Sequence, residues 1–193
     1  LYIDFNNQQY IDVIEKCDTY ILDFQGEPIV TKFEFLKALA IARVYGFKEY
    51  EKALTFIKLN YSSTIEGKEA ERILDDVLPT VKNDRFLKND LSDNYKIVYQ
   101  FDTVSNIDID SQITTLKKYI DKVDYLDLTV SEDFYNNIIT FVVVHGLKSY
   151  DGSLGLAERL ENSIDIQAKS FFVISTDNYK TIQIHKNLDK FEK

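Results

Sequence analysis

The hydrophobic pattern of this chain changes its period between Pro79 and Asn94. Before that segment, apolar residues recur at steps of three and four, which is the spacing of one face of an α-helix. After it, short runs alternate or are β-branched, as in strands. The 193 residues, 45% of them hydrophobic, suffice for two small cores. The pattern predicts an α+β chain with a helical domain at 1–80, a linker at 81–94 and an α/β domain at 95–193.

Four amphipathic stripes predict four helices in the first domain, at residues 10–24, 31–44, 50–61 and 70–78. In the second of these the expected stripe is Phe35, Leu39 and Ala42, and Thr64 is the expected N-cap of the fourth. The first and third helices resemble each other at an offset of 40 residues, as the following pairs show: Tyr10 and Tyr50, Val13 and Ala53, Ile14 and Leu54, Cys17 and Ile57. Repeated helical hairpins of this length are typical of an α-solenoid of the tetratricopeptide or HEAT kind. Because such arrays need about three repeats, we expect the array to begin upstream of Leu1.

Four strands and two helices are predicted in the second domain, in the order β-α-β-β-α-β. The strands are expected at 95–101, 125–130, 136–144 and 171–174, and the helices at 108–123 and 149–162. Asp110 or Ser111 is the expected N-cap of the first helix. This order is that of a ferredoxin-like split βαβ unit. Asn178 and Tyr179 should form a turn after the last strand, and the tail at 181–193 should add a short strand and a terminal helix.

No residues of the sequence have the spacing of a catalytic or metal centre. His145 and His185 lie 40 residues apart without an HExxH neighbourhood, and Cys17 is the only cysteine. The segment that begins at Asp108 starts like a calcium loop but lacks its glycine and closing glutamate, so we expect helix capping there. A Gly-x-Ser-x-Gly nucleophile motif is also missing. We therefore predict no enzyme activity, no cofactor and no metal ion.

The charge of the chain argues against two classes of partner. The formal net charge is -9, and acidic residues outnumber basic ones in both halves. Phosphate backbones and anionic lipid surfaces both favour a basic patch. The aromatic signature of an RNA-recognition strand is also missing from residues 136–144. We therefore expect no nucleic-acid partner and no direct membrane binding by this part of the protein.

One face of the predicted sheet needs a cover. Two crossover helices on one face leave the other face open, yet the third strand is apolar on both of its faces. Either the tail or the helical domain packs there, or the face is a docking surface for another protein. In the second case the candidate partner-binding residues are Tyr99, Phe141, Phe172 and Tyr179.

Four strings of residues resemble one known family. FEFLKALAI at 33–41, YEKAL at 50–54 and NYSSTIEGKEA at 60–70 are similar to its last tetratricopeptide units, and FFVISTDNY at 171–179 is similar to its C-terminal signature. The family is SprE/PorW, the tetratricopeptide lipoproteins of gliding motility and the type IX protein secretion system. The resemblance covers essentially the whole chain, as the C-terminal part of a longer protein. Two departures are Ser62 and Lys180, where the family tends to have proline.

The resemblance implies a periplasmic lipoprotein associated with the outer membrane, which connects the secretion translocon with other proteins of the secretion and motility complex. It supplies no catalytic residue. Since the chain has no methionine, we expect it to be a fragment, attached to the membrane only through its missing N-terminal part. The leading hypothesis is a non-catalytic protein-interaction scaffold. The alternative is a regulatory small-ligand-binding domain on a helical-repeat scaffold, and the sequence does not name the direct partner.

Overall fold

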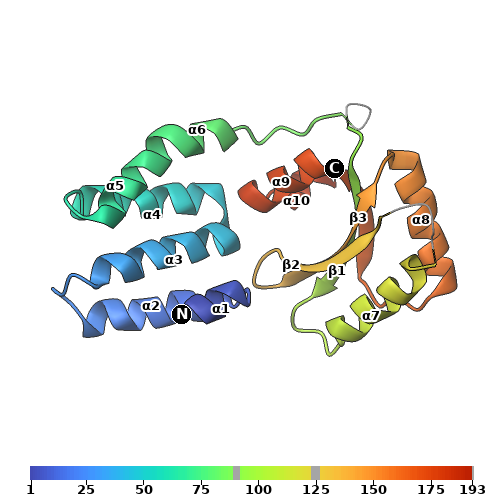
Figure 1. Cartoon of the computed structure of the whole chain (residues 1–193), viewed down its shortest axis with the longest axis horizontal. Helices are drawn as coiled ribbons and strands as arrows, with labels where there is room; N and C mark the ends of the chain where they lie inside the picture. The colour runs from blue at the N-terminus through green and yellow to red at the C-terminus, as the bar shows by residue number, and fades with distance from the viewer. Residues whose placement is uncertain (89–91, 123–126, 193) are drawn as a thin grey trace. The chain divides into compact units, whose positions relative to one another are not determined.

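The protein is α+β and contains two compact units. The computed structural model describes residues 1–88, 92–122 and 127–192 (Figure 1). The helical unit comprises Leu1–Arg85 with Thr181–Lys193, and the sheet unit comprises Phe86–Lys180. The tail, which we expected to belong to the second domain, therefore falls in the helical unit instead.

The helical unit is a succession of helices joined by short turns. The helices are α1 (Tyr2–Asn6), α2 (Tyr10–Asp23), α3 (Val30–Tyr45), α4 (Phe47–Asn60), α5 (Ile65–Arg72) and α6 (Leu78–Val81). Contacts join α2 to α3, α3 to α4, and α4 to α5. Helices α2, α3 and α4 run side by side in alternating directions (Figure 1). The first three predicted helices are present, whereas the fourth, expected at 70–78, is divided between the end of α5, a π-helical turn and the start of α6, and α1 was not predicted.

Local residues decide where these helices begin and end. Gly46 separates α3 from α4, as expected. The prediction that Thr64 caps α5 is confirmed, because its hydroxyl accepts a hydrogen bond from the Gly67 backbone N–H at 3.0 Å. Residues Ile73–Val77 form a π-helical turn before Pro79, whose ring would clash with the carbonyl four residues upstream in a regular α-helix.

Helix α3 is buried on two sides within the helical unit. Because α3 contacts both α2 and α4, its buried residues do not lie on one stripe. They are Val30, Thr31, Leu36, Ala38, Ala40 and Val44. The predicted stripe of Phe35, Leu39 and Ala42 is only partly buried, so the one-sided prediction for this helix is wrong.

The tail is helical throughout its regular part. Helices α9 (Thr176–His185) and α10 (Leu188–Phe191) replace both the predicted turn at Asn178 and Tyr179 and the predicted short strand. Contacts of the His185 ring within the helical unit favour a helix over a strand there. Within the helical unit, the His185 ring lies 5.2 Å from the Phe47 ring, and its Nε2 is 2.9 Å from the Val81 carbonyl oxygen.

The sheet unit has the expected order of strands and helices. Its elements are β1 (Tyr95–Asp102), α7 (Ile109–Ile120), β2 (Thr129–Phe134), β3 (Ile139–Leu147), α8 (Tyr150–Ser163) and β4 (Ser170–Ser175). The strands pair antiparallel in the order β2-β3-β1-β4. The N-cap of α7 is Asp108, whose carboxylate accepts from the Ser111 N–H at 3.1 Å, and not Asp110 or Ser111 as predicted.

Two strand positions differ from the prediction. The second strand was expected at 125–130 but occupies Thr129–Phe134, and residues 125 and 126 lie outside the described residues. The third strand begins at Ile139 and continues to Leu147, past its apolar run. In both cases polar residues complete the strand, because pairing between β2 and β3 satisfies their backbone groups.

The two faces of the sheet carry different kinds of side chains. Helices α7 and α8 lie on one face (Figure 1). There the core consists of alternate β1 residues with Leu116, Ile120, Leu156 and Leu160. We call the opposite side the second face. By strand alternation and register it carries Lys96, Ser131, Asp133, Phe141, His145 and Phe172.

Candidate functional site

An aromatic cluster lies on the second face of the sheet, with Phe141 at its centre. The Phe141 ring stacks on Tyr135 at a centroid distance of 4.7 Å. Phe172 lies edge-on at 6.0 Å, and Tyr179 of α9 lies at 6.3 Å. The structure therefore brings together three of the four predicted partner-binding residues.

The prediction that these aromatic residues are exposed is wrong for Tyr99 and Phe141. Both are 0% exposed, and Tyr179 is 7% exposed, while Phe172 is partly buried. Tyr99 lies on the other face, among the core residues beneath the helices, where its ring is 5.9 Å from Phe171. Strand alternation decides this, since Tyr99 and Gln100 must point to opposite faces. Their role in partner binding stays a prediction.

Substitution of Tyr99 by phenylalanine is expected to stabilise the sheet unit. Among the described residues, the Tyr99 hydroxyl has no hydrogen-bond partner, and burial raises its pKa. Removing an unsatisfied buried hydroxyl should raise the free energy of unfolding by about 1 kcal/mol, as measured by denaturant titration. Tyr179→Phe is the matched control and should lower it, because the Tyr179 hydroxyl donates to Asp133 at 2.6 Å. Equal losses in both variants would contradict this reading.

A chain of polar side chains lies beside the aromatic cluster, and we call it the polar relay. Lys96 Nζ is 2.8 Å from His145 Nδ1, and His145 Nε2 is 2.7 Å from Ser131 Oγ. The Ser131 hydroxyl is 2.8 Å from Asp133 Oδ1, and the Tyr179 hydroxyl is 2.6 Å from Asp133 Oδ2. The relay thus connects β1, β3, β2 and α9 within the sheet unit.

A β-bulge positions the histidine of the relay. Between β1 and β3 the register shifts, so that His145 and Gly146 together lie opposite Lys96. Gly146 has a φ of 95°, which glycine adopts readily and other residues do not, and a Cβ there would lie 2.4 Å from the Asp127 carbonyl oxygen. The bulge therefore depends on glycine at this position.

With Lys96 charged, one arrangement of protons satisfies every bond of the relay. The Lys96 ammonium has no acceptor function, so it donates to His145 Nδ1. A neutral imidazole with Nδ1 as acceptor carries its proton on Nε2, which then donates to Ser131 Oγ. The Ser131 hydroxyl in turn donates to the Asp133 carboxylate. The direction of donation therefore runs from the cation of Lys96 to the anion of Asp133.

The electrostatics of the relay agree with this arrangement. Burial, followed by the Lys96 charge, lowers the pKa of His145 below its ordinary value, while Asp133 partly opposes this shift. Burial also lowers the pKa of Lys96. Because His145 Nε2 donates to Ser131, it does not act as a base toward that hydroxyl. The His145 and Ser131 pair therefore lacks the proton direction of an activated nucleophile.

The relay joins residues that no sequence motif connects. In the sequence, Ser131 and Asp133 follow the strand expected at 125–130, and His145 is a lone histidine after an apolar run. The available signal was the two-residue spacing of Ser131 and Asp133, which places both on one face. Among the described residues, no group of three or more His, Cys, Asp or Glu side chains is arranged to hold a metal ion.

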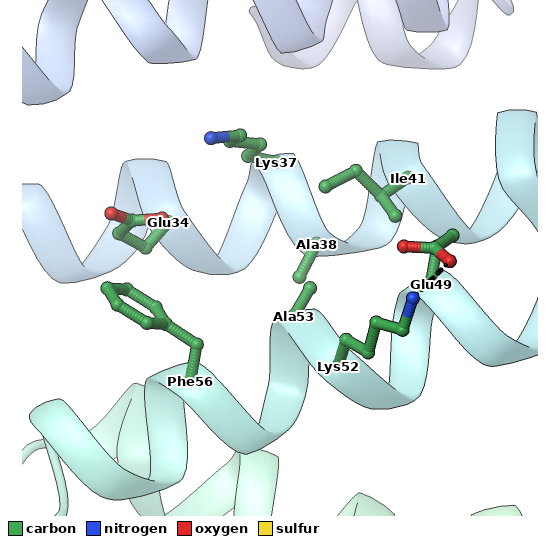
Figure 2. A pocket seen from close by; sticks show the side chains of 8 residues that line it. All are labelled: Glu34, Lys37, Ala38, Ile41, Glu49, Lys52, Ala53 and Phe56. Atoms are coloured by element: carbon green, nitrogen blue, oxygen red, sulfur yellow. Dashed lines mark hydrogen bonds and ion pairs between the residues drawn. The ribbon is translucent and has the colours of Figure 1, made fainter.

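A groove lies between α3 and α4 of the helical unit, with a volume of about 350 Å³. Its lining residues are Glu34, Lys37, Ala38, Ile41, Glu49, Lys52, Ala53 and Phe56. Figure 2 shows Ala38 and Ala53 facing each other across the floor, with Glu34 and Phe56 near one end. The alanines leave the floor shallow and apolar, so the groove could accept the side chains of another polypeptide.

The rim of this groove carries both signs of charge. Lys52 donates to Glu49 at 2.6 Å at one end (Figure 2), and Lys37 pairs with Asp18 of α2. Burial raises the pKa of Glu34. The groove residues are two acids and two bases, so their formal charges cancel although the chain as a whole is acidic. Such a rim suits a polypeptide of mixed charge better than a polyanion.

Two further ionisable groups of the helical unit are perturbed by burial. The Cys17 thiol is fully buried, and burial raises its pKa to about 11, so it should be inert toward thiol reagents in the folded protein. Burial, with Arg43 as a smaller cause, lowers the pKa of Lys186 to about 7. Lys186 donates to Gln183 at 3.0 Å and has a positive φ of 51°. Neither residue was expected to be a functional group.

Comparison with protein-family models, curated proteins and solved structures gives no significant match. Over the described parts of the chain, none of the helices combines the length and the apolar character that crossing a membrane requires.

Proposed function

We propose that this chain is a non-catalytic scaffold that binds another polypeptide in the groove between α3 and α4. The observation that carries the proposal is the groove itself, with its floor of small apolar side chains and its rim of balanced charge. Helix hairpins bind peptides through surfaces of this kind, in which apolar pockets supply affinity and charged rims supply specificity.

We also propose the finer description of each unit. Helices α2 to α5 would be tetratricopeptide-like hairpins, a reading supported by their consecutive contacts. The sheet unit would be ferredoxin-like, a reading supported by its β-α-β-β-α-β order and its β2-β3-β1-β4 sheet. The resemblance to the SprE/PorW family then suggests work at the periplasmic side of the outer membrane, with other proteins of the secretion and motility complex as partners.

The non-catalytic part of the proposal has support from the polar relay. His145 Nε2–H donates a hydrogen bond to the Ser131 hydroxyl and so does not act as its base, and the Asp133 carboxylate that accepts from Ser131 also accepts from Tyr179. The Cys17 thiol, another potential nucleophile, is buried with a raised pKa. A scaffold needs neither group to react.

Substitution of Phe56 by aspartate is expected to weaken partner binding by at least about tenfold, because it replaces an aromatic contact of the interface with a charge. Phe56 lines the groove and is 46% exposed, so the change should leave the fold intact. The measurement is affinity capture from extracts of the source cells with the chain as bait, followed by quantitative mass spectrometry. A photo-crosslinking phenylalanine analogue in place of Phe56 should attach to the same polypeptide.

Leu59→Asp is the matched control. Leu59 is on the same helix, is 74% exposed and does not line the groove. It should therefore retain every captured polypeptide. Circular dichroism should show equal helix content in both variants. If Phe56→Asp captures the same polypeptides as Leu59→Asp, or the analogue at position 56 forms no crosslink, the groove is not the binding surface.

A further inference from the structure

The geometry points to a second property of the protein, which is that the polar relay is a proton-sensitive latch that fastens the start of α9 to the sheet. With His145 neutral, the relay is complete and holds Tyr179 in place. Protonation of His145 breaks the relay at Lys96 and loosens the first turns of α9. This inference concerns the sheet unit alone and does not depend on the groove between α3 and α4.

The latch holds Tyr179 at two points. The Tyr179 hydroxyl donates to Asp133 at 2.6 Å, a short bond to a charged acceptor. The Lys96 ammonium lies 5.6 Å from the centre of the Tyr179 ring, within the range of a cation–π contact. Lys96 is therefore shared between the Tyr179 ring and His145 Nδ1. A change in the charge of His145 therefore affects Tyr179 through the position of Lys96.

Protonation of His145 is incompatible with the relay as it stands. A proton on Nδ1 would place a second donor and a second positive charge 2.8 Å from the Lys96 ammonium. One of the two side chains must then move. If Lys96 moves, Tyr179 loses the cation over its ring. A charged His145 also attracts Asp133, which competes with the bond from the Tyr179 hydroxyl.

Charged and titratable groups face His145 from each element around it. Lys96 faces it from β1, Asp133 lies beyond Ser131 on β2, and Tyr179 of α9 donates to Asp133, while the charge of Lys180 acts on Lys96. Asp133 favours the charged imidazole, whereas Lys96 and burial disfavour it, and the net effect lowers the pKa.

The lowered pKa fixes the direction of the pH dependence. An unfolded histidine has a pKa of about 6.5, and in the folded state that of His145 is lower. Between the two values the unfolded state binds more protons than the folded state, so stability rises with pH there. The contribution of the relay is therefore complete above about pH 6.5 and is lost as the pH falls below that value.

The test is amide hydrogen exchange of residues 176–180 in the whole chain, at about pH 7.5 and about pH 5.5, with rates corrected for intrinsic exchange. Wild-type protection should fall about fivefold at the lower pH, as expected for the loss of one hydrogen bond. His145→Gln should show no such fall, because its side chain does not titrate. His185→Gln, which removes the other histidine, should keep the wild-type response.

A second variant covers the case in which His145→Gln does not fold. In Lys96→Met the charge opposite Nδ1 is gone, so an NMR titration should show a higher pKa for the His145 ring than in the wild type. Protection of residues 176–180 should then depend less on pH than in the wild type, because only burial still lowers the His145 pKa. The inference is overturned if wild-type protection does not change with pH, if His185→Gln abolishes the change, or if Lys96→Met leaves the His145 titration where it was.

Discussion

Replacing Phe141 by alanine is expected to lower the free energy of unfolding of the sheet unit by about 4 kcal/mol. Phe141 is 0% exposed and lies against the rings of Tyr135, Phe172 and Tyr179. Truncation removes its buried area and leaves a cavity that three aromatic rings on different elements cannot easily fill. The measurement is native-state hydrogen exchange of β1 and β3 amides in increasing denaturant, which reports this unit separately from the helical one.

The matched control for this prediction is Ile138→Ala. Ile138 directly precedes β3, but it is 57% exposed, so its truncation should cost less than about 0.5 kcal/mol. A comparable loss in the two variants would show that the aromatic cluster around Phe141 does not hold the second face together. Protection of the helical unit should remain unchanged in both variants.

Gly67→Ala should destabilise the helical unit by about 3 kcal/mol, although alanine is the better helix former. A Cβ at Gly67 would lie 1.9 Å from the carbonyl oxygen of Tyr61, and backbone atoms cannot give way as side chains do. Helix α5 must therefore shift, which breaks the Thr64 cap and disturbs the bond between Thr31 and Glu66. Hydrogen exchange of α4 and α5 amides measures the loss.

The same substitution at Gly155 is the control. Nothing lies within 4 Å of a Cβ at Gly155, which is inside α8, so Gly155→Ala should stabilise the sheet unit by about 0.5–1 kcal/mol.

For Gly67→Ala, the rate at which a thiol reagent modifies Cys17 is a second readout, because this buried thiol reacts only when α2 opens. If Gly67→Ala leaves both exchange and thiol reactivity unchanged, the close approach of α5 to Tyr61 is not a constraint.

The order of elements could be predicted from local patterns. A period of three to four residues marked α2 to α5, and β-branched or alternating runs marked the strands. Thr64 was recognisable as a cap because its hydroxyl needs only the N–H three residues later. The second strand was placed too early because its polar half, Ser131 to Asp133, resembles a loop until β3 is present to pair with it.

The candidate sites could be predicted less well from the sequence than the order of elements. Tyr99 and Phe141 were both chosen as exposed aromatics, and strand alternation with the packing of both faces buries them completely. The groove between α3 and α4 depends on which sides of two helices face each other, and a stripe on one helix does not state this. The polar relay joins residues from four elements through register and a bulge.

By itself, the sequence determined the two kinds of periodicity, the order of helices and strands, and several of the points at which they begin and end. These properties depend on neighbours within one or two helical turns, so local chemistry suffices. Tertiary structure alone decided that α3 is buried on two sides, that the tail is helical, and that Lys96, His145, Ser131 and Asp133 meet Tyr179. The physical reason is that hydrogen-bond partners and buried faces are set by strand register and helix packing, which join residues far apart in the chain.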